Sequence, residues 1–334
     1  MATVSELTPL QQRKVAAIVG ACVADAAAQP LHWIYKDDVM AGLIEGKEEI
    51  EFRDPSANPF YRLPNGRNTT YFEQTYVLLK SLVESKGLNT DQLKKATYEF
   101  FGPNSEYEIP RTTMPIEGPW RHGGIRDFIA NVDAKKERTG SETDEQIDSV
   151  VRVIPLVALY AGQPDFLKKA EEGLRVLQES NLTISCGLAA ARALEQIILT
   201  GKSDNIVQNT IYALNNAGRS NPVEKDRTVA GLLQDVLKAS STSHVEAVPT
   251  FKKSCQLPGS LQSAMHGVLT VPGYVDSVRT TIRAGGCNAS RSGFIGACRA
   301  AQEGFDAIPE SWRQRTKRYE EVLALALALV KLQE

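Results

Sequence analysis

A short stretch near the C-terminus carries the side chains whose types and spacing are most suggestive of chemistry. Residues 285–290 read GGCNAS, and glycines let a backbone approach a ligand closely because they lack a Cβ. A helix with small residues at spacings of three and four follows, which predicts close packing against a partner helix. A thiol just before a helix N-terminus loses its proton more readily than a free thiol. Cys287 is therefore a candidate for thiol chemistry, with a small buried cysteine as the alternative.

A carboxylate and an imidazole lie near the other end of the chain. Asp25 interrupts the apolar run VAAIVGACVADAAA, and a buried charge needs a hydrogen-bonding partner, an opposite charge or a metal. Pro30 ends this helix and is followed at once by His32 and two aromatic residues, Trp33 and Tyr35. The cluster could line a pocket. The alternatives are a structural hydrogen bond from Asp25 to a neighbouring loop and a purely packed aromatic core.

The longest irregular stretch covers residues 102–148. Loops of this length in compact domains are usually either functional or disordered, and the aromatic residues of this one favour a packed loop. It contains Trp120 and His122. Arg121 and His122 could face a pocket, and a surface position is the simpler interpretation.

Hydrophobic periodicity predicts helices along nearly the whole chain and no buried sheet. A first helix begins after Ser5 or Thr8 and has Pro9 in its first turn. Residues 47–68 are predicted to be a loop, and Pro155 predicts a kink or break. Further helices are predicted from Tyr71 to about Gly87 and over 90–101, 147–160, 167–179, 182–199, 206–215, 228–238, 260–269, 274–283, the stretch after 290, and 312–332. We therefore predict an all-α fold that forms one domain over residues 1–334.

The composition narrows the range of functions. The chain has 334 residues, 42% of them hydrophobic and 23% charged, which is typical of a globular protein with a substantial core. A net charge of −2 gives no electrostatic reason to expect nucleic acid or an anionic membrane as partner. The five cysteines form no zinc-type spacing with the four histidines. No signal core and no run of about 18 apolar residues is present, so we predict a cytosolic protein without a membrane span.

Two motifs resemble those of a known family. The stretch AIVGACVADAAAQPLHW is similar to the first motif of the ADP-ribosylglycohydrolases, roughly G-x-x-x-G-D-A-x-G-x-P. The stretch RAGGCNASRSGFIGACRAAQEGFDAIPESW is similar to their last motif, in which G-G-D-x-D-T precedes a small-residue helix and A-I-P-x-x-W. Their order and separation agree as well, so the resemblance covers nearly the whole chain. The GGxNASR wording and the GPWRHG loop are closest to the branch with selenoprotein J of fishes and the J-type crystallins of cubozoan jellyfish.

The resemblance implies a helical bundle whose cleft holds two Mg²⁺ ions that orient a ribose and a water for hydrolysis. Mg²⁺ needs oxygen ligands, and two neighbouring ions need several carboxylates to offset their repulsion. The aspartates of the last motif correspond here to Cys287 and Ala289, and its threonine to Ser290. The T-D-D-T motif of an early helix corresponds to residues 71–74, which leaves Glu73 as the one carboxylate there.

These arguments give a set of candidate site residues. The candidates for catalysis are Glu73 and Cys287. The candidates for metal binding are Glu73, Asp148, Asn288 and Ser290. The candidates for lining a ligand pocket are Asp25, His32, Trp120, His122, Gly285, Gly286, Asn288 and Ser290. Because one assured carboxylate cannot hold a Mg²⁺ pair, we expect no bound cofactor, with a single Mg²⁺ as the alternative.

Three functions are compatible with the sequence. The first is a soluble structural protein of the crystallin type without conventional hydrolase activity, and only the resemblance suggests an eye-lens role. The second is hydrolysis of an ADP-ribosyl bond, or binding of ADP-ribose or a related nucleotide, with a reduced metal site. The third is thiol redox chemistry at Cys287, because its place before a helix N-terminus favours the thiolate. Selenocysteine occurs in the branch that the chain resembles, but one sequence does not assign its position.

Overall fold

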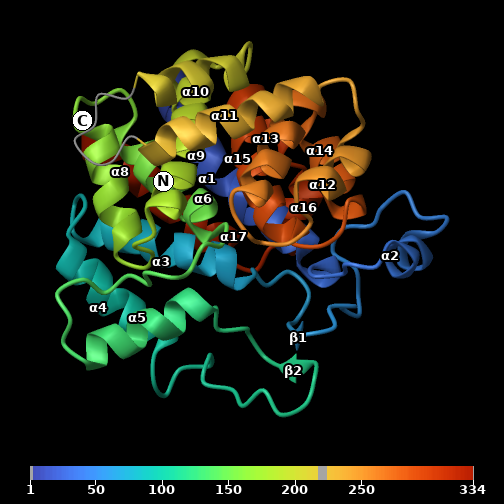
Figure 1. The fold of residues 1–334 in the computed structure, drawn as a ribbon, viewed down its shortest axis with the longest axis horizontal. Coiled ribbons are helices and arrows are strands. Elements are labelled where there is room, and N and C mark those ends of the chain that lie inside the picture. The colour runs from blue at the N-terminus through green and yellow to red at the C-terminus, as the bar shows by residue number, and fades with distance from the viewer. Residues whose placement is uncertain (1–2, 217–223, 334) are drawn as a thin grey trace.

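Helices make up nearly all the regular structure of the computed structural model, which describes residues 3–216 and 224–333 (Figure 1). The α-helices of the described residues are α1 Pro9–Ala28, α2 Asp37–Ile44, α3 Thr70–Glu84, α4 Thr90–Phe101, α5 Gly123–Asp133, α6 Asp148–Arg152, α7 Ile154–Tyr160, α8 Phe166–Arg175, α9 Asn181–Thr200, α10 Ile206–Asn215, α11 Glu224–Lys238, α12 His244–Phe251, α13 Gly259–Thr270, α14 Tyr274–Arg283, α15 Asn288–Glu303, α16 Glu310–Arg315 and α17 Tyr319–Val330. Two short strands, β1 Tyr61–Arg62 and β2 Ile116–Glu117, pair in parallel. The predicted all-α class is confirmed.

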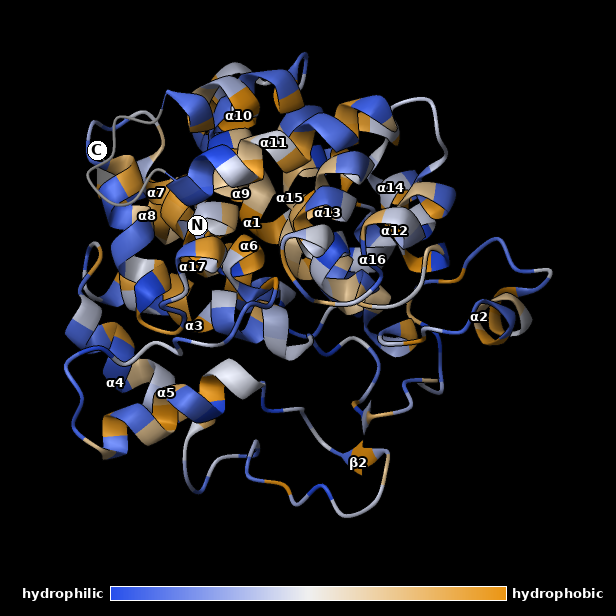
Figure 2. Cartoon of the chain, viewed as in Figure 1, coloured by the Kyte–Doolittle hydropathy of each residue, from blue (hydrophilic) through white to orange (hydrophobic). Residues whose placement is uncertain are grey.

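Helix α1 runs through the centre of the molecule (Figure 1). The Thr8 side chain accepts a hydrogen bond from the Gln11 amide, and Gln11 bonds back to the Thr8 backbone, which is the reciprocal pattern of a capping box. Pro9 occupies the first turn, as predicted. From Lys14 onward every residue of α1 is buried, and Figure 2 shows the hydrophobic colouring concentrated on this central region. The helix can be buried on all sides because most of its residues are apolar and small.

Helices α1 and α15 are in backbone contact. A Cβ added at Gly20 would lie 2.5 Å from the Cβ of Ala300, and a Cβ added at Gly296 would lie 2.6 Å from the Cβ of Ala24. Contacts this short leave no room for a larger side chain on either helix. The close helix packing that the small-residue spacing predicts is therefore confirmed. This close packing holds α15, whose N-cap is Cys287, against α1.

Two helical segments are long and apolar enough to cross a membrane by length and composition. They are Pro9–Leu31 and Asn181–Thr200, and the most apolar windows of the two are 100% and 72% buried inside the protein. Such burial is the environment of a core helix, since the apolar surface is already covered by other helices.

Two helix breaks have different causes, and only one of these causes is visible in the sequence. Pro155 has no N–H to bond to Val151, and the chain divides there into α6 and α7, as predicted. The Thr75 hydroxyl donates instead to the Val151 carbonyl, at 3.2 Å. The prediction of one helix over 312–332 is wrong, because α16 and α17 are separate helices. The Lys317 amide donates to the Gly66 carbonyl between them, so a tertiary hydrogen bond replaces a helical one.

Three short helices lie where no helix is predicted. These are α2, α12 and α5, and α5 lies inside the stretch 102–148. Helix α5 begins with two glycines and α12 contains Pro249, so local propensity argues against both. Phe128 of α5 and Val248 of α12 are fully buried, which indicates that tertiary packing stabilises these helices.

Candidate functional site

Two glycines bring three distant segments together before α15. Gly285 and Gly286 have φ values of 72° and 64°, a left-handed conformation that favours glycine. Gly286 exchanges backbone hydrogen bonds with the loop after α1: the Trp33 amide donates to its carbonyl, and its own amide donates to Ile34. A Cβ on Gly286 would lie 2.3 Å from the Lys253 carbonyl oxygen. The glycine turn thus places Cys287 beside the loop after α1 and beside the segment after α12.

The Cys287 sulfur lies in a polar environment although its residue is completely buried. It lies 3.5 Å from Nε2 of His32, 3.2 Å from the hydroxyl oxygen of Tyr71 and 3.1 Å from that of Ser290. On the other side of its ring, His32 places Nδ1 2.7 Å from the Tyr61 hydroxyl oxygen. Cysteine, imidazole and phenol therefore form a continuous chain of polar contacts, which an inert core cysteine does not require.

The surroundings of Cys287 favour its thiolate. Burial raises the pKa of the Cys287 thiol, but hydrogen bonds from Cys255, His32 and Ser290 outweigh it and hold the pKa well below its usual value. Burial also lowers the pKa of His32, and the contact with Cys287 opposes that shift. The buried Arg291 guanidinium adds positive charge and is held by the carbonyls of Lys253 and Gly285. Cys287 is also the N-cap of α15, where the helix dipole stabilises negative charge.

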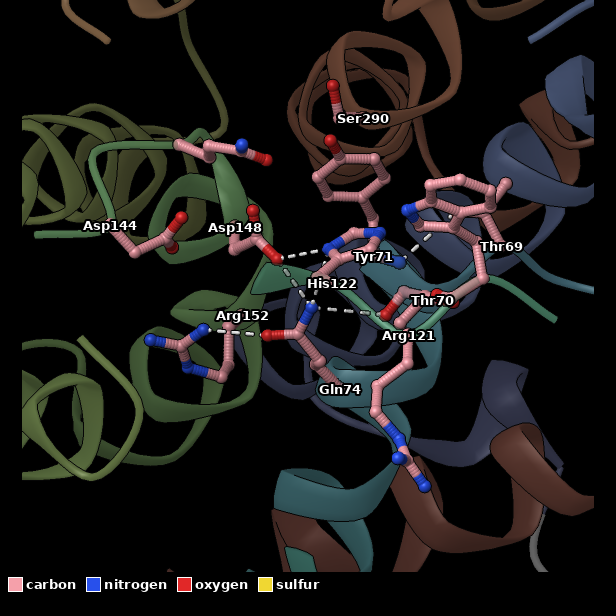
Figure 3. A network of polar contacts seen from close by, with 12 residues as sticks. Thr69, Thr70, Tyr71, Gln74, Arg121, His122, Asp144, Asp148, Arg152 and Ser290 are labelled. Atoms are coloured by element: carbon pink, nitrogen blue, oxygen red, sulfur yellow. Dashed lines mark hydrogen bonds and ion pairs between the residues drawn. The ribbon is translucent and has the colours of Figure 1, made fainter. Parts of the chain in front are cut away.

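A second buried network adjoins the first (Figure 3). Oδ1 of Asp148 lies 2.5 Å from Nδ1 of His122 and accepts a hydrogen bond of 2.6 Å from the Gln74 amide. Arg152 donates to the amide oxygen of Gln74 at 2.9 Å. Oδ2 of Asp148 is buried and has no hydrogen-bond partner in the structure. Burial raises the pKa of Asp148, but the charge and hydrogen bond of His122 outweigh it, so the net shift is downward.

The surface position expected for His122 is therefore wrong. Only 4% of His122 is exposed, and its ring is paired with Asp148. Burial lowers the pKa of His122, but the Asp148 carboxylate opposes this and the net shift is upward. Arg121, in contrast, is half-buried and directs its guanidinium away from this network, where it donates to the Gly102 carbonyl (Figure 3).

Aromatic rings join the two networks. The Tyr71 ring lies between those of His32 and His122, with centroid distances of 5.6 Å and 4.4 Å. Trp33 stacks on His32 at 4.6 Å and meets Trp120 edge-on at 5.7 Å. Trp33 has a φ of 61°, a conformation that is costly for a bulky residue and that occurs often at functional sites. Among the described residues, one buried polar site therefore extends from Cys287 to Arg152.

The sequence candidates divide into two groups. The site contains His32, His122, Asp148, Gly285, Gly286, Cys287 and Ser290, with Trp120 at its aromatic edge. Asn288 begins α15 and donates to the Leu31 carbonyl at 2.9 Å, while its side-chain oxygen is buried without a partner. Asp25 and Glu73 are engaged elsewhere.

Asp25 and Glu73 hold the ends of helices. Both carboxylate oxygens of Asp25 accept hydrogen bonds from Thr69, and one also accepts from Asn68, so Asp25 fixes the residues before α3. Asp25 therefore forms structural hydrogen bonds to a neighbouring loop, which is one of the two roles that the sequence allows for it. Glu73 accepts two hydrogen bonds, of 2.8 Å and 3.0 Å, from Nε of Arg318. Neither carboxylate forms a hydrogen bond or ion pair with the residues around Cys287.

Tyr61, Tyr71, Gln74, Arg152 and Cys255 belong to the site but were not among its sequence candidates. Arg152 gives the clearest signal in retrospect, because it interrupts an apolar helix just as Asp25 does. Tyr61 and Cys255 come from irregular segments, and no sequence pattern connects them to Cys287. Within residues 3–216 and 224–333, no group of three or more His, Cys, Asp or Glu side chains is arranged to hold a metal ion.

Comparison with known proteins identifies the family. The profile of the ADP-ribosylglycohydrolases matches residues 6–334. Crystallin J1A of Tripedalia cystophora is 37% identical over 324 residues, covering 96% of this chain and 97% of the crystallin. Crystallin J1B of the same organism is 35% identical, covering 97% of this chain and 98% of the crystallin. The solved structure of an ADP-ribosylglycohydrolase-related protein complex superimposes with a TM-score of 0.70 at 18% identity, covering 98% of this chain and 100% of its own. The chain belongs to the ADP-ribosylglycohydrolase family.

Proposed function

We propose that this protein is a crystallin-like member of its family that does not use a pair of magnesium ions to hydrolyse ADP-ribosyl bonds. One observation carries the proposal: Cys287 and Ala289 stand at the start of α15, where the family motif has two aspartates. A thiol is a poor ligand for Mg²⁺, which prefers oxygen, and a methyl group is no ligand. The glycine turn and the small-residue helix of the family motif are retained, but the residues at its two aspartate positions are different.

The other candidate ligands support the same conclusion. Glu73 is buried and bonded to Arg318, so recruiting it to a metal would leave the arginine without its partner. Asp148 directs Oδ1 to His122 and Gln74. Its free oxygen Oδ2 is one carboxylate ligand, whereas two neighbouring ions need several. The residues present therefore do not fit a Mg²⁺ pair.

The crystallin-like role is supported by the relatives. Two crystallins match nearly the full length of the chain at 35–37% identity. A structural role requires a stable fold that stays soluble at high concentration, and it requires no catalytic site. The continuous core of α1, α9 and α15 and the dispersed charges of both signs are compatible with this requirement.

A two-stage measurement tests the proposal. The protein is titrated with Mg²⁺ by calorimetry, and the same sample is assayed for release of ADP-ribose from an ADP-ribosylated peptide, beside an active family hydrolase. We expect no binding of a metal pair and no release. Binding of two ions with turnover would overturn the proposal.

Thermal melts distinguish a protein that binds ADP-ribose, which is the remaining alternative, from a purely structural protein. A ligand that binds only the folded state must raise the Tm. We expect ADP-ribose to leave the Tm unchanged, with and without Mg²⁺. A higher Tm without turnover would identify a nucleotide-binding protein in place of a purely structural one.

A further inference from the structure

A second cysteine lies against Cys287. The Cys287 amide donates to the Lys253 carbonyl at 2.8 Å, so residues 253–255 run alongside the start of α15. The Cys255 and Cys287 thiols interact, and this interaction raises the pKa of Cys255 while it helps to lower that of Cys287. Neither cysteine is in a disulfide. The pair therefore joins an easily ionised thiol to one that keeps its proton.

We propose that Cys287 and Cys255 are a redox-active dithiol that reduces a small hydroperoxide and closes to a disulfide. Three contacts equip Cys287 as the attacking sulfur, because His32, Tyr71 and Ser290 lie within 3.5 Å of it. The backbone hydrogen bond from Cys287 to Lys253 brings Cys255, two residues further on, to the same place. Cysteines that react with peroxides are low-pKa thiolates that the oxidant can reach, often with a resolving thiol beside them. The proposal does not depend on the crystallin-like role.

The burial of the pair restricts the oxidant to a small one. Cys287 has no exposed surface, whereas Cys255 is half-buried. Tyr35 is 39% exposed and interacts electrostatically with both thiols, so it lies near the outer side of the pair. A peptide or a nucleotide has no direct access to the Cys287 sulfur. Hydrogen peroxide is the oxidant of this class that is closest to water in size.

The reaction balances in two steps. The Cys287 thiolate attacks one oxygen of hydrogen peroxide; an S–O bond forms, the O–O bond breaks, and the departing hydroxide is protonated to water. Cys255 then attacks the sulfenic sulfur; the S–S bond forms, the S–O bond breaks, and the second hydroxide leaves with the Cys255 proton as water. Two thiols lose two electrons, and one peroxide becomes two waters. An external dithiol restores the reduced pair by exchange.

His32 is a catalytic acid–base residue in this scheme. Its Nε2 lies 3.5 Å from the Cys287 sulfur, and the Tyr61 hydroxyl fixes the opposite ring nitrogen at 2.7 Å. The ring can hold the proton that the thiol gives up, and it can return one to the departing hydroxide. The charged and titratable groups with which Cys287 also interacts are Tyr35, Tyr61, Tyr71, His122 and Arg291.

Peroxide oxidation of the full chain, followed by mass spectrometry, tests the pair. With one equivalent of hydrogen peroxide, we expect a Cys255–Cys287 linked peptide that is two hydrogens lighter than the separate thiols. The variant Cys255→Ser retains the attacking sulfur and lacks the resolving one, so dimedone that is present while the oxidised protein is unfolded should label Cys287 in it. We expect sulfenic acid to form at Cys287 before it forms at the other buried cysteines.

Cys298 provides the matched control. It lies in the same helix and is equally buried, but burial raises its pKa to about 12 and it has no comparable polar contacts in the structure. It should remain unlabelled. The proposal is overturned if Cys287 and Cys298 react alike, or if no linked peptide forms while both thiols remain free. His32→Asn should slow sulfenic acid formation without preventing disulfide closure, which distinguishes a role in proton transfer from simple packing.

Discussion

Asp25 shows what a single buried carboxylate does in this fold. It lies in the middle of α1 and accepts hydrogen bonds from the Thr69 amide at 2.8 Å and the Thr69 hydroxyl at 2.6 Å. Asn68 adds a third bond, at 3.0 Å. These contacts set the position from which α3 begins, and α3 in turn carries Tyr71 and Gln74 into the candidate site.

The stability of the protein should depend on the titration of Asp25. Burial raises the pKa of Asp25 to about 7, and the hydrogen bonds from Thr69 and Asn68 only partly oppose it. In the unfolded chain the group titrates near 3.8. The folded state therefore binds the proton more tightly, so the contribution of Asp25 to the unfolding free energy is highest below about pH 4 and falls as pH rises toward 7. The change is on the order of 4 kcal/mol for this group.

Urea denaturation across this pH range measures the effect. Because other groups titrate as well, the relevant quantity is the pH slope of the wild type relative to Asp25→Asn, which cannot ionise. We expect the variant to lose most of the decline between about pH 4 and pH 7. Parallel curves for the two proteins would contradict the expected titration.

The sequence predicted where the candidate site lies, but it predicted only some of the residues that form it. The glycine turn and Cys287 were visible in the sequence because glycine, thiol and helix start are adjacent in the chain. Glu73 was a poor choice for a reason that helix geometry explains: residues two apart point about 200° from each other, whereas residues three apart share a face. Tyr71 and Gln74 are three apart and both face the site. Glu73 therefore points away from them, toward Arg318.

At the scale of elements, small residues determine how closely α1 and α15 pack. Gly20 and Gly296 face one another so closely that an added Cβ on either would meet a backbone oxygen within 3 Å. The sequence predicted that a partner helix packs closely on α15, because spacings of three and four are local information, but it did not identify α1 as that helix. It did not predict α2, α5 or α12, because contacts with distant parts of the chain stabilise these short helices.

Substituting the contact glycine should be destabilising. Gly296→Ala places a methyl group 2.6 Å from the Cβ of Ala24, so the two helices must separate, and we expect a loss of about 1–3 kcal/mol of unfolding free energy. The matched control is Gly231→Ala in α11, where nothing lies within 4 Å of the added Cβ. Alanine has the higher helix propensity, so the control should gain about 0.5–1 kcal/mol. Chemical denaturation measures both, and equal effects would contradict the close packing.

At the scale of the whole molecule, the start of α17 is tied to α3 by a buried charge pair. Arg318 donates from Nε to both oxygens of Glu73, and its guanidinium carbon lies 4.0 Å from the centre of the Tyr76 ring. Glu73 is almost completely buried, while the Arg318 side chain is 23% exposed. No sequence pattern links residues 245 positions apart, so neither the pair nor the division between α16 and α17 beside it was predicted.

Breaking this pair should destabilise the protein more than removing it. Arg318→Met leaves the Glu73 carboxylate buried without a cation, which should cost about 3–5 kcal/mol of unfolding free energy. Adding Glu73→Gln removes that charge, so the double variant should recover part of the loss. The control is Lys95→Met, because its exposed partner Glu99 lies 4.0 Å away and an exposed pair contributes little. If Glu73 instead served a metal, Mg²⁺ would protect the Arg318→Met variant from unfolding, and that protection would contradict the structural role assigned to the carboxylate.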